Sequence, residues 1–154
     1  MNSFNSNINT SNDLISIENL KVQFKKRSKI FNKIIEDAKK YAKQNNCSHE
    51  CIVPISGGKD SHYQVWLLKE KYGLNPLLVH YDHVFNAHSG KANLENLVNK
   101  SKCDLILYRS GLDAVRKISK WSLEKLGDLT WHYHAGIRTF PFQIAVKYNI
   151  PDVF

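Results

Sequence analysis

The stretch Cys51-Ile52-Val53-Pro54-Ile55-Ser56-Gly57-Gly58-Lys59-Asp60-Ser61 decides the fold of this 154-residue chain. Its first five residues form a short apolar run, which predicts a buried β-strand. Pro54 should lie near the end of that strand, because proline cannot donate to a central ladder. A Ser-Gly-Gly turn follows, and a helix begins at Asp60 or Ser61 and continues to about Tyr72. A strand that passes through a glycine turn into a helix is typical of a parallel α/β sheet.

The chain beyond this stretch repeats the alternation of short apolar runs and helical patterns. Strands are predicted over residues 77–81 and 105–108, and helices over residues 90–101, 112–126 and 134–148. The alternation predicts an α/β fold with three layers, in which helices cover both faces of a parallel sheet. Proline 141 should either kink the last helix or mark its true start.

The two ends of the chain carry different signals. Residues 1–12 are rich in Asn and Ser and are predicted to form a disordered tail. Residues 13–46 have apolar side chains at three- and four-residue spacing, which predicts an N-terminal helical segment of one long or two shorter helices. Residues 47–154 form the α/β domain. Because a fourth strand only begins at residues 150–154, we expect this domain to be truncated and its sheet incomplete.

Composition narrows the class of protein. The chain is 42% hydrophobic and 23% charged, has no apolar run near the roughly 20 residues of a membrane span, and begins without a secretory signal. We therefore expect a cytoplasmic protein without a membrane partner, whose three cysteines are reduced thiols. The net charge of +8 suits nucleotides or nucleic acid, but the basic residues are spread along the chain. Solvated helix faces explain most of them, so we do not expect a nucleic-acid partner.

The glycine turn has the chemistry of a phosphate site. Two glycines let the backbone approach a ligand closely, and the amides at the start of the helix favour an anion. Lys59 adds a positive charge, whereas Asp60 would repel phosphate unless it caps the helix or holds a Mg²⁺ ion that bridges phosphates. The spacing differs from the commoner Gly-x-x-x-x-Gly-Lys loop. The predicted nucleotide-binding residues are Ser56, Gly57, Gly58, Lys59, Asp60 and Ser61.

This hexapeptide resembles the signature of the PP-loop ATP pyrophosphatases. Longer stretches resemble one branch of that superfamily, the N-acetyl sugar amidotransferases of surface-polysaccharide synthesis: residues 51–65, 71–79, 93–98, 131–137 and 143–151. The resemblance implies a HUP-type fold, similar to that of the adenine nucleotide alpha hydrolases. It also implies ATP and Mg²⁺ as cofactors, with Asp60 as the metal-binding residue.

The resemblance implies a reaction as well. A sugar acetamido or carboxyl oxygen attacks the α-phosphate of ATP and releases pyrophosphate, and ammonia then displaces AMP, in lipopolysaccharide sugar biosynthesis. The implied partners are a nucleotide-activated N-acetyl sugar and a separate glutaminase that supplies ammonia. Lys59, Asp60, His132 and His134 are the catalytic candidates. Asp82 matches a family aspartate at the end of the second strand, where it would meet the adenosine or cap the next helix.

Some positions depart from this branch, and other functions stay open. His83 and Val84 stand where the branch usually has Asn-Gly, and Tyr133 replaces a cysteine.

The alternatives to a sugar amidotransferase are a tRNA-modifying PP-loop enzyme and a remnant that binds ATP without turnover. His80, His83 and His88 could join a metal site with the later histidines, but polar loop roles are favoured. Trp121 and Trp131 are expected in the core.

Overall fold

The computed structural model describes residues 10–85 and 87–154, with side chains described from residue 28 onward. The chain divides into two compact units, residues 1–37 and 38–154. One continuous helix, α1 (Thr10–Asn45), accounts for the described part of the first unit and continues into the second. It begins three residues before the predicted Asp13, so Thr10, Ser11 and Asn12 are helical. Residues 1–9 of the predicted tail lie outside the described residues.

The second unit has the predicted alternation of strands and helices. Its last helix begins at Trp131 and contains Pro141, so the proline does not mark the start of the helix. The helix predicted after the glycine turn is α-helical for eight residues and then continues as a π-helical segment, η1. The elements are β1 (Cys51–Pro54), α2 (Lys59–Trp66), η1 (Leu67–Lys71), β2 (Pro76–Asp82), α3 (His88–Ser101), β3 (Leu105–Arg109), α4 (Leu112–Leu126), α5 (Trp131–Tyr148) and β4 (Asp152–Val153).

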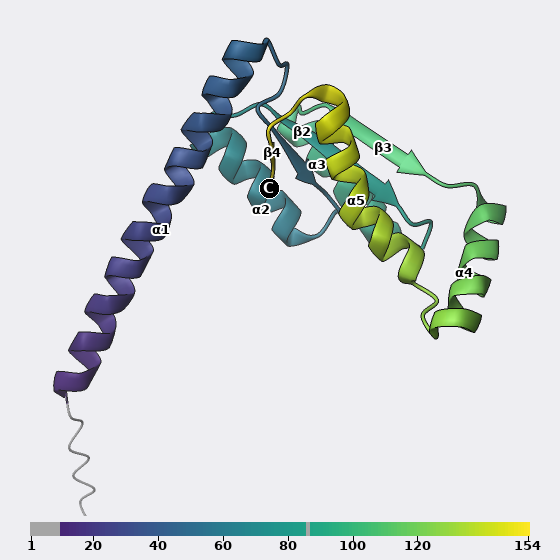
Figure 1. Ribbon diagram of the computed structural model, residues 1–154, viewed down its shortest axis with the longest axis horizontal. Coiled ribbons are helices and arrows are strands. Elements are labelled where there is room, and N and C mark those ends of the chain that lie inside the picture. The colour runs from purple at the N-terminus through teal and green to yellow at the C-terminus, as the bar shows by residue number, and fades with distance from the viewer. Residues whose placement is uncertain (1–9, 86) are drawn as a thin grey trace, which may run out of the picture. The chain divides into compact units, whose positions relative to one another are not determined.

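The four strands form one parallel sheet in the order β3-β2-β1-β4. In the register of the sheet, Cys51 of β1 pairs with Pro76 of β2 on one side and with Asp152 of β4 on the other. Helices α2 and α3 cover one face, and α5 lies across the opposite face (Figure 1). The carboxyl ends of the strands therefore lie together at one edge, where ligands of such sheets bind.

The core follows from the two-residue period of the strands. Ile52, Leu77 and Val79 point to the α5 face and form a cluster with Ile144 and Ala145. The alternate residues Cys51, Val53 and Leu78 point to the other face and are completely buried. Burial raises the pKa of the Cys51 thiol to about 12, so this cysteine stays protonated and packs as a small apolar residue.

The expectation that Trp121 and Trp131 belong to the core is wrong. Trp121 and Trp131 are 50% and 45% exposed, and their rings pack against each other edge-to-face between α4 and α5, with ring centroids 6.5 Å apart. Among the helices of the described residues, none combines the length and apolar character that a membrane crossing requires.

Candidate functional site

The glycine turn lies at the carboxyl end of β1, between the strand and α2. The backbone N–H of Ser56 donates to Oγ of Ser61 at 3.2 Å, which closes the turn. Ser61 is buried, whereas Ser56 is exposed. The hydroxyl of Ser61 thus holds the loop in shape, and the Ser56 hydroxyl is the one that faces solvent.

Position 57 is the place in this turn that requires glycine. Its φ angle is +79°, in the region that side chains strongly disfavour. A Cβ atom at this position would lie 2.5 Å from the carbonyl oxygen of Gly90 and 3.3 Å from the amide nitrogen of Leu94. The turn therefore packs directly on the first turns of α3, with no space between them.

The start of α2 is open to a ligand. Gly58 is its N-cap residue, and no side chain of the described residues caps the helix, so the first-turn amides have no partner within it. Lys59 and Asp60 are both exposed there. Asp60 therefore does not cap the helix, and its carboxylate pairs with no N–H or cation among the described residues.

His80 joins the turn to the second strand. It lies within the predicted second strand, but it is only 3% exposed, so the polar loop role that the sequence favoured is wrong. Backbone pairing of β1 with β2 ends at Pro54 and Val79, and the N–H of Ile55 then donates to the Val79 carbonyl at 2.9 Å. Nδ1 of His80 lies 2.7 Å from the Ile55 carbonyl oxygen, which can only accept, so Nδ1 carries the proton.

Asp82 ends β2 as predicted, but its carboxylate is already engaged. It is 2% exposed, accepts from the Val84 amide at 2.8 Å and from Nε of Arg109 at 2.6 Å, and forms an ion pair with Nη2 of Arg109. Burial acts to raise the pKa of Asp82, but the Val84 amide and the Arg109 guanidinium outweigh it and hold the pKa below its ordinary value. Since Ala87 is the N-cap residue of α3, Asp82 does not cap that helix.

A cavity of about 180 Å³ opens beside the turn, over the ends of β1 and β2. Ser56, His80 and His83 line it from the sheet, and Ile137 and Pro141 line it from α5. Burial lowers the pKa of His83, so its imidazole tends to be neutral. The cavity provides space next to the open start of α2.

The two histidines of α5 lie in different surroundings. His134 is exposed, whereas His132 is only 7% exposed. The ring of Tyr133 lies between them in the sequence and packs on His83, with ring centroids 4.8 Å apart. His132 lines a separate cavity, which shares Tyr81 with the cavity beside the turn. Among the described residues, no three histidine, cysteine or acidic side chains are grouped to hold a metal ion.

Comparisons with known proteins identify the fold. No protein-family model matches the chain. An uncharacterized protein of Methanocaldococcus jannaschii is 36% identical over 75 residues, which are 49% of this chain and 27% of that protein. The NH3-dependent NAD synthetase of Campylobacter jejuni aligns with a TM-score of 0.54 at 15% identity, over 81% of this chain and 54% of its own. The NMN synthetase of Francisella tularensis aligns with a TM-score of 0.54 at 18% identity, over 79% and 50%.

The chain therefore has the α/β fold of these synthetases, with helices on both faces of a parallel sheet, and the predicted fold class is confirmed. It spans about half the length of the two solved structures and about a quarter of the curated relative. Neither structure is a sugar amidotransferase. The sugar substrate, the glutaminase partner and the roles of individual site residues stay predictions.

Sequence reasoning did not find the partners of two residues of this site. His80 could have been found, because a histidine inside an otherwise apolar buried strand needs a hydrogen-bond partner. Arg109 lies at the end of β3, but its pairing with Asp82 could not have been read from the sequence. That pair depends on which strands are neighbours and on their register, in which Asp82 lies opposite Arg109.

Proposed function

We propose that this chain is the ATP-binding part of a PP-loop synthetase that adenylates an oxygen of a nucleotide-activated N-acetyl sugar. The observation that carries the proposal is the geometry of the turn. Gly57 packs on α3, the Ser61 hydroxyl closes the loop, and Lys59 lies exposed at the uncapped start of α2. This arrangement leaves amide donors and one ammonium group open to a phosphate.

The loop would hold the β- and γ-phosphates of ATP, since these leave together as pyrophosphate. Negative charge grows on that leaving group, and the start of α2 and Lys59 are placed to stabilise it. The unpaired Asp60 carboxylate supplies an oxygen ligand of the kind Mg²⁺ prefers. When bound, the metal ion would neutralise charge between the phosphates. The cavity lined by Ser56, His80 and His83 gives the rest of the nucleotide a place next to the loop.

The proposed reaction needs no nucleophile from the protein. The acetamido oxygen of the sugar bonds to the α-phosphorus as the bond to the β-phosphate oxygen breaks, and pyrophosphate leaves. Ammonia then adds to the activated carbon, and AMP departs with the former acetamido oxygen. The task of the chain is to align the oxygen with the α-phosphate and to exclude water. The glutaminase that delivers ammonia is part of this proposal.

An isotope experiment tests the reaction. The acetamido oxygen of a UDP-N-acetyl sugar is labelled with ¹⁸O, and the protein is incubated with ATP, Mg²⁺ and ammonium. We expect pyrophosphate in the medium and ¹⁸O in the phosphate of AMP, which mass spectrometry detects. Formation of ADP and phosphate would reject a PP-loop reaction altogether.

Two further results separate the alternatives. Label-free AMP with pyrophosphate would mean that ATP is cleaved at the right bond but that the sugar is not the acceptor. ATP binding in calorimetry without any AMP would instead favour a nucleotide-binding remnant. Stimulation of AMP release by tRNA, and not by the sugar, would favour the tRNA-modifying alternative.

A further inference from the structure

A groove lies between α3 and the strands β2 and β3. It consists of an inner cavity of about 290 Å³ and an outer cavity of about 280 Å³ beyond the end of β3. The two cavities adjoin, since Asp82, Lys91 and Arg109 line both of them. No residue of the turn from Ser56 to Ser61 lines either cavity, so the phosphate site described above does not account for this groove.

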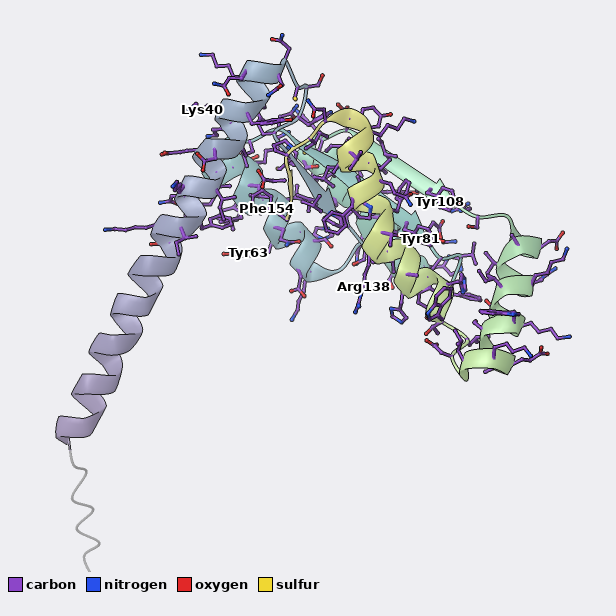
Figure 2. All side chains as sticks on the ribbon, in the orientation of Figure 1. Lys40, Tyr63, Tyr81, Tyr108, Arg138 and Phe154 are labelled. Carbon is purple, nitrogen blue, oxygen red and sulfur yellow. The ribbon has the colours of Figure 1, made fainter. Side chains whose placement is uncertain are left out.

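The two-residue period of the strands decides which side chains face the groove. In the register of the sheet Asp82 of β2 lies opposite Arg109 of β3, and His80 lies two residues before Asp82. The residues that alternate with them, Tyr81 and Tyr108, point to the α5 face, where their rings stack with centroids 5.3 Å apart (Figure 2). The side chains of His80, Asp82 and Arg109 therefore point toward α3 and into the groove.

His80 brings an unsatisfied acceptor to the inner cavity. It is only 3% exposed, and its Nδ1 donates a hydrogen bond to the Ile55 carbonyl oxygen. In the neutral ring Nε2 is then an acceptor, and it has no hydrogen-bond partner among the described residues. The carboxylate of Glu95, which also only accepts when ionised, lines the same cavity. Because buried polar groups are nearly always satisfied, Nε2 indicates a ligand that offers a hydrogen-bond donor at this end of the groove.

The outer cavity has an excess of positive charge. Arg109 donates to Asp82 through Nε and forms an ion pair with it through Nη2, so these two side chains neutralise each other. Lys91, in the first turn of α3, is exposed and forms no ion pair among the described residues. The lining of the outer cavity thus carries one positive charge in excess. This suits a carboxylate better than a phosphate ester, which carries a charge of roughly −1.5 to −2 near pH 7.

The spacing of these groups sets the size of the ligand. His80 precedes Asp82 by two residues, and a strand rises roughly 3.3 Å per residue, so the donor and the anionic group of the ligand should lie roughly 6–7 Å apart. The remaining walls of the inner cavity are mostly apolar and come from α3 and β3: Leu94, Val98, Leu105 and Leu107.

We infer that this groove binds a small organic carboxylate with an apolar body and a hydroxyl group at its far end. The carboxylate meets Lys91 and Arg109, and the hydroxyl donates to Nε2 of His80. An ammonium group is the poorer donor here, because taking a charge out of water beside the buried His80 costs more than burying a hydroxyl. The inference does not rest on the proposed function, since no residue of the glycine turn takes part in it.

The test uses calorimetry and NMR on the full chain with three probes: 4-hydroxybenzoate, benzoate and 4-hydroxybenzamide. Benzoate lacks the hydroxyl, and 4-hydroxybenzamide lacks the charge. We expect 4-hydroxybenzoate to bind, and each of the other two to bind roughly 10-fold more weakly, because each has lost one contact. The ¹⁵N signal of His80 Nε2 should shift with 4-hydroxybenzoate and not with benzoate. Equal binding of the three probes, or binding of none, would overturn the inference.

Two lysine variants locate the carboxylate. Lys91→Ala should weaken the binding of 4-hydroxybenzoate by roughly 10-fold and leave that of 4-hydroxybenzamide unchanged, since only the first probe carries a charge. Lys100→Ala is the matched control, because Lys100 is also an exposed lysine of α3 but lines neither cavity. Both variants should fold like the parent, since both side chains are exposed. An Lys91→Ala protein that keeps its affinity for 4-hydroxybenzoate, or that loses both probes equally, would contradict the inference.

ATP titrations separate the groove from the nucleotide site. Asp82 lines the groove and is also the predicted contact of the adenosine, so ATP is added to the complex with 4-hydroxybenzoate. We expect both ligands to bind together. If ATP displaces 4-hydroxybenzoate, the groove belongs to the nucleotide site and the inference is overturned. If 4-hydroxybenzoate binds through Lys91 but ATP does not bind, the groove stands as a carboxylate site and the proposed ATP-dependent reaction fails.

Discussion

The side chain of His80 in β2 forms a hydrogen bond to Ile55, the residue just before the glycine turn. Because the Ile55 carbonyl can only accept, the bond from Nδ1 of His80 fixes both the tautomer of the ring and the direction in which the chain enters the turn. Since His80 is buried, water cannot replace this bond. We therefore regard His80 as a positioning residue of the loop, which also lines the cavity beside the turn.

Replacing His80 tests that role. His80→Asn places an amide nitrogen close to the position of Nδ1 and should keep the bond, whereas His80→Leu cannot donate. We expect His80→Leu to weaken ATP binding by roughly 10-fold, as the loss of about one buried hydrogen bond allows, and to speed hydrogen exchange at residues 56–58. Calorimetry and exchange mass spectrometry measure these effects. Equal behaviour of the two variants would rule out the positioning role.

The charge of Lys59 should act on the ligand directly. Lys59→Ala removes one charge-assisted contact to phosphate, which is worth roughly 1.5–3 kcal/mol and so roughly 10- to 100-fold in the Kd for ATP. Lys120→Ala is a matched control, because Lys120 is an exposed lysine of α4 paired only loosely with Glu124 at 3.9 Å. Calorimetry at constant ionic strength should show the loss only for Lys59→Ala. An unchanged affinity of that variant would count against the phosphate loop.

The turn and α3 act as one packed unit, and adjacent glycines make this testable. Gly57→Ala puts a Cβ atom into the Gly90 carbonyl at a φ of +79°, and the left-handed backbone alone costs roughly 1–2 kcal/mol for a residue with a side chain. Gly58→Ala meets only the Ser56 side chain at 3.5 Å, which is an ordinary contact, and Gly58 has a φ of −80°.

Urea unfolding of the two alanine variants measures the difference. We expect Gly57→Ala to unfold at clearly lower urea concentration than the parent, and Gly58→Ala to lie within about 1 kcal/mol of it. Equal destabilisation by both substitutions would show that the turn does not pack on α3 as described.

Across the whole molecule, stability should fall as the solution becomes mildly acidic. The pKa values of His83 and His132 are both lowered in the folded protein, mainly by burial. Just below the unfolded pKa of about 6.5, the unfolded chain binds protons that the folded protein does not. Their contribution is complete above that pKa and is lost as the pH falls through the folded values. Asp82, whose folded pKa is also lowered, contributes in a separate window below its ordinary value of 3.8.

Urea unfolding at about pH 7.5 and about pH 5.5 measures this effect. The parent should be less stable at the lower pH, and His132→Leu should reduce the difference. A difference that is the same in the variant and the parent would mean that His132 takes no part in it.

Much of the fold was predictable, because local chemistry and the periods of the apolar residues specify it. The apolar run from Cys51 predicted the buried strand β1, and the helices predicted to about Tyr72 and to residue 126 end just before Gly73 and Gly127, which have positive φ angles. The turn from Ser56 to the start of α2 was predictable, and its role as a phosphate loop stays a prediction from the glycines, the lysine and the helix start within six residues. These features depend on residues that are close together in the chain, so the sequence alone is enough to predict them.

Contacts between distant segments could not be predicted from the sequence, because they depend on the order of the strands in the sheet. The bond from His80 to the Ile55 carbonyl and the pair of Asp82 and Arg109 join residues from distant segments of the chain. The sequence offered His132 as a catalytic candidate, yet its burial appears only when α4 lies against α5. The local pattern of this chain therefore specifies the loop that would hold phosphate. The packing of its elements in three dimensions specifies the surroundings of that loop, because burial and hydrogen-bond partners belong to the folded arrangement.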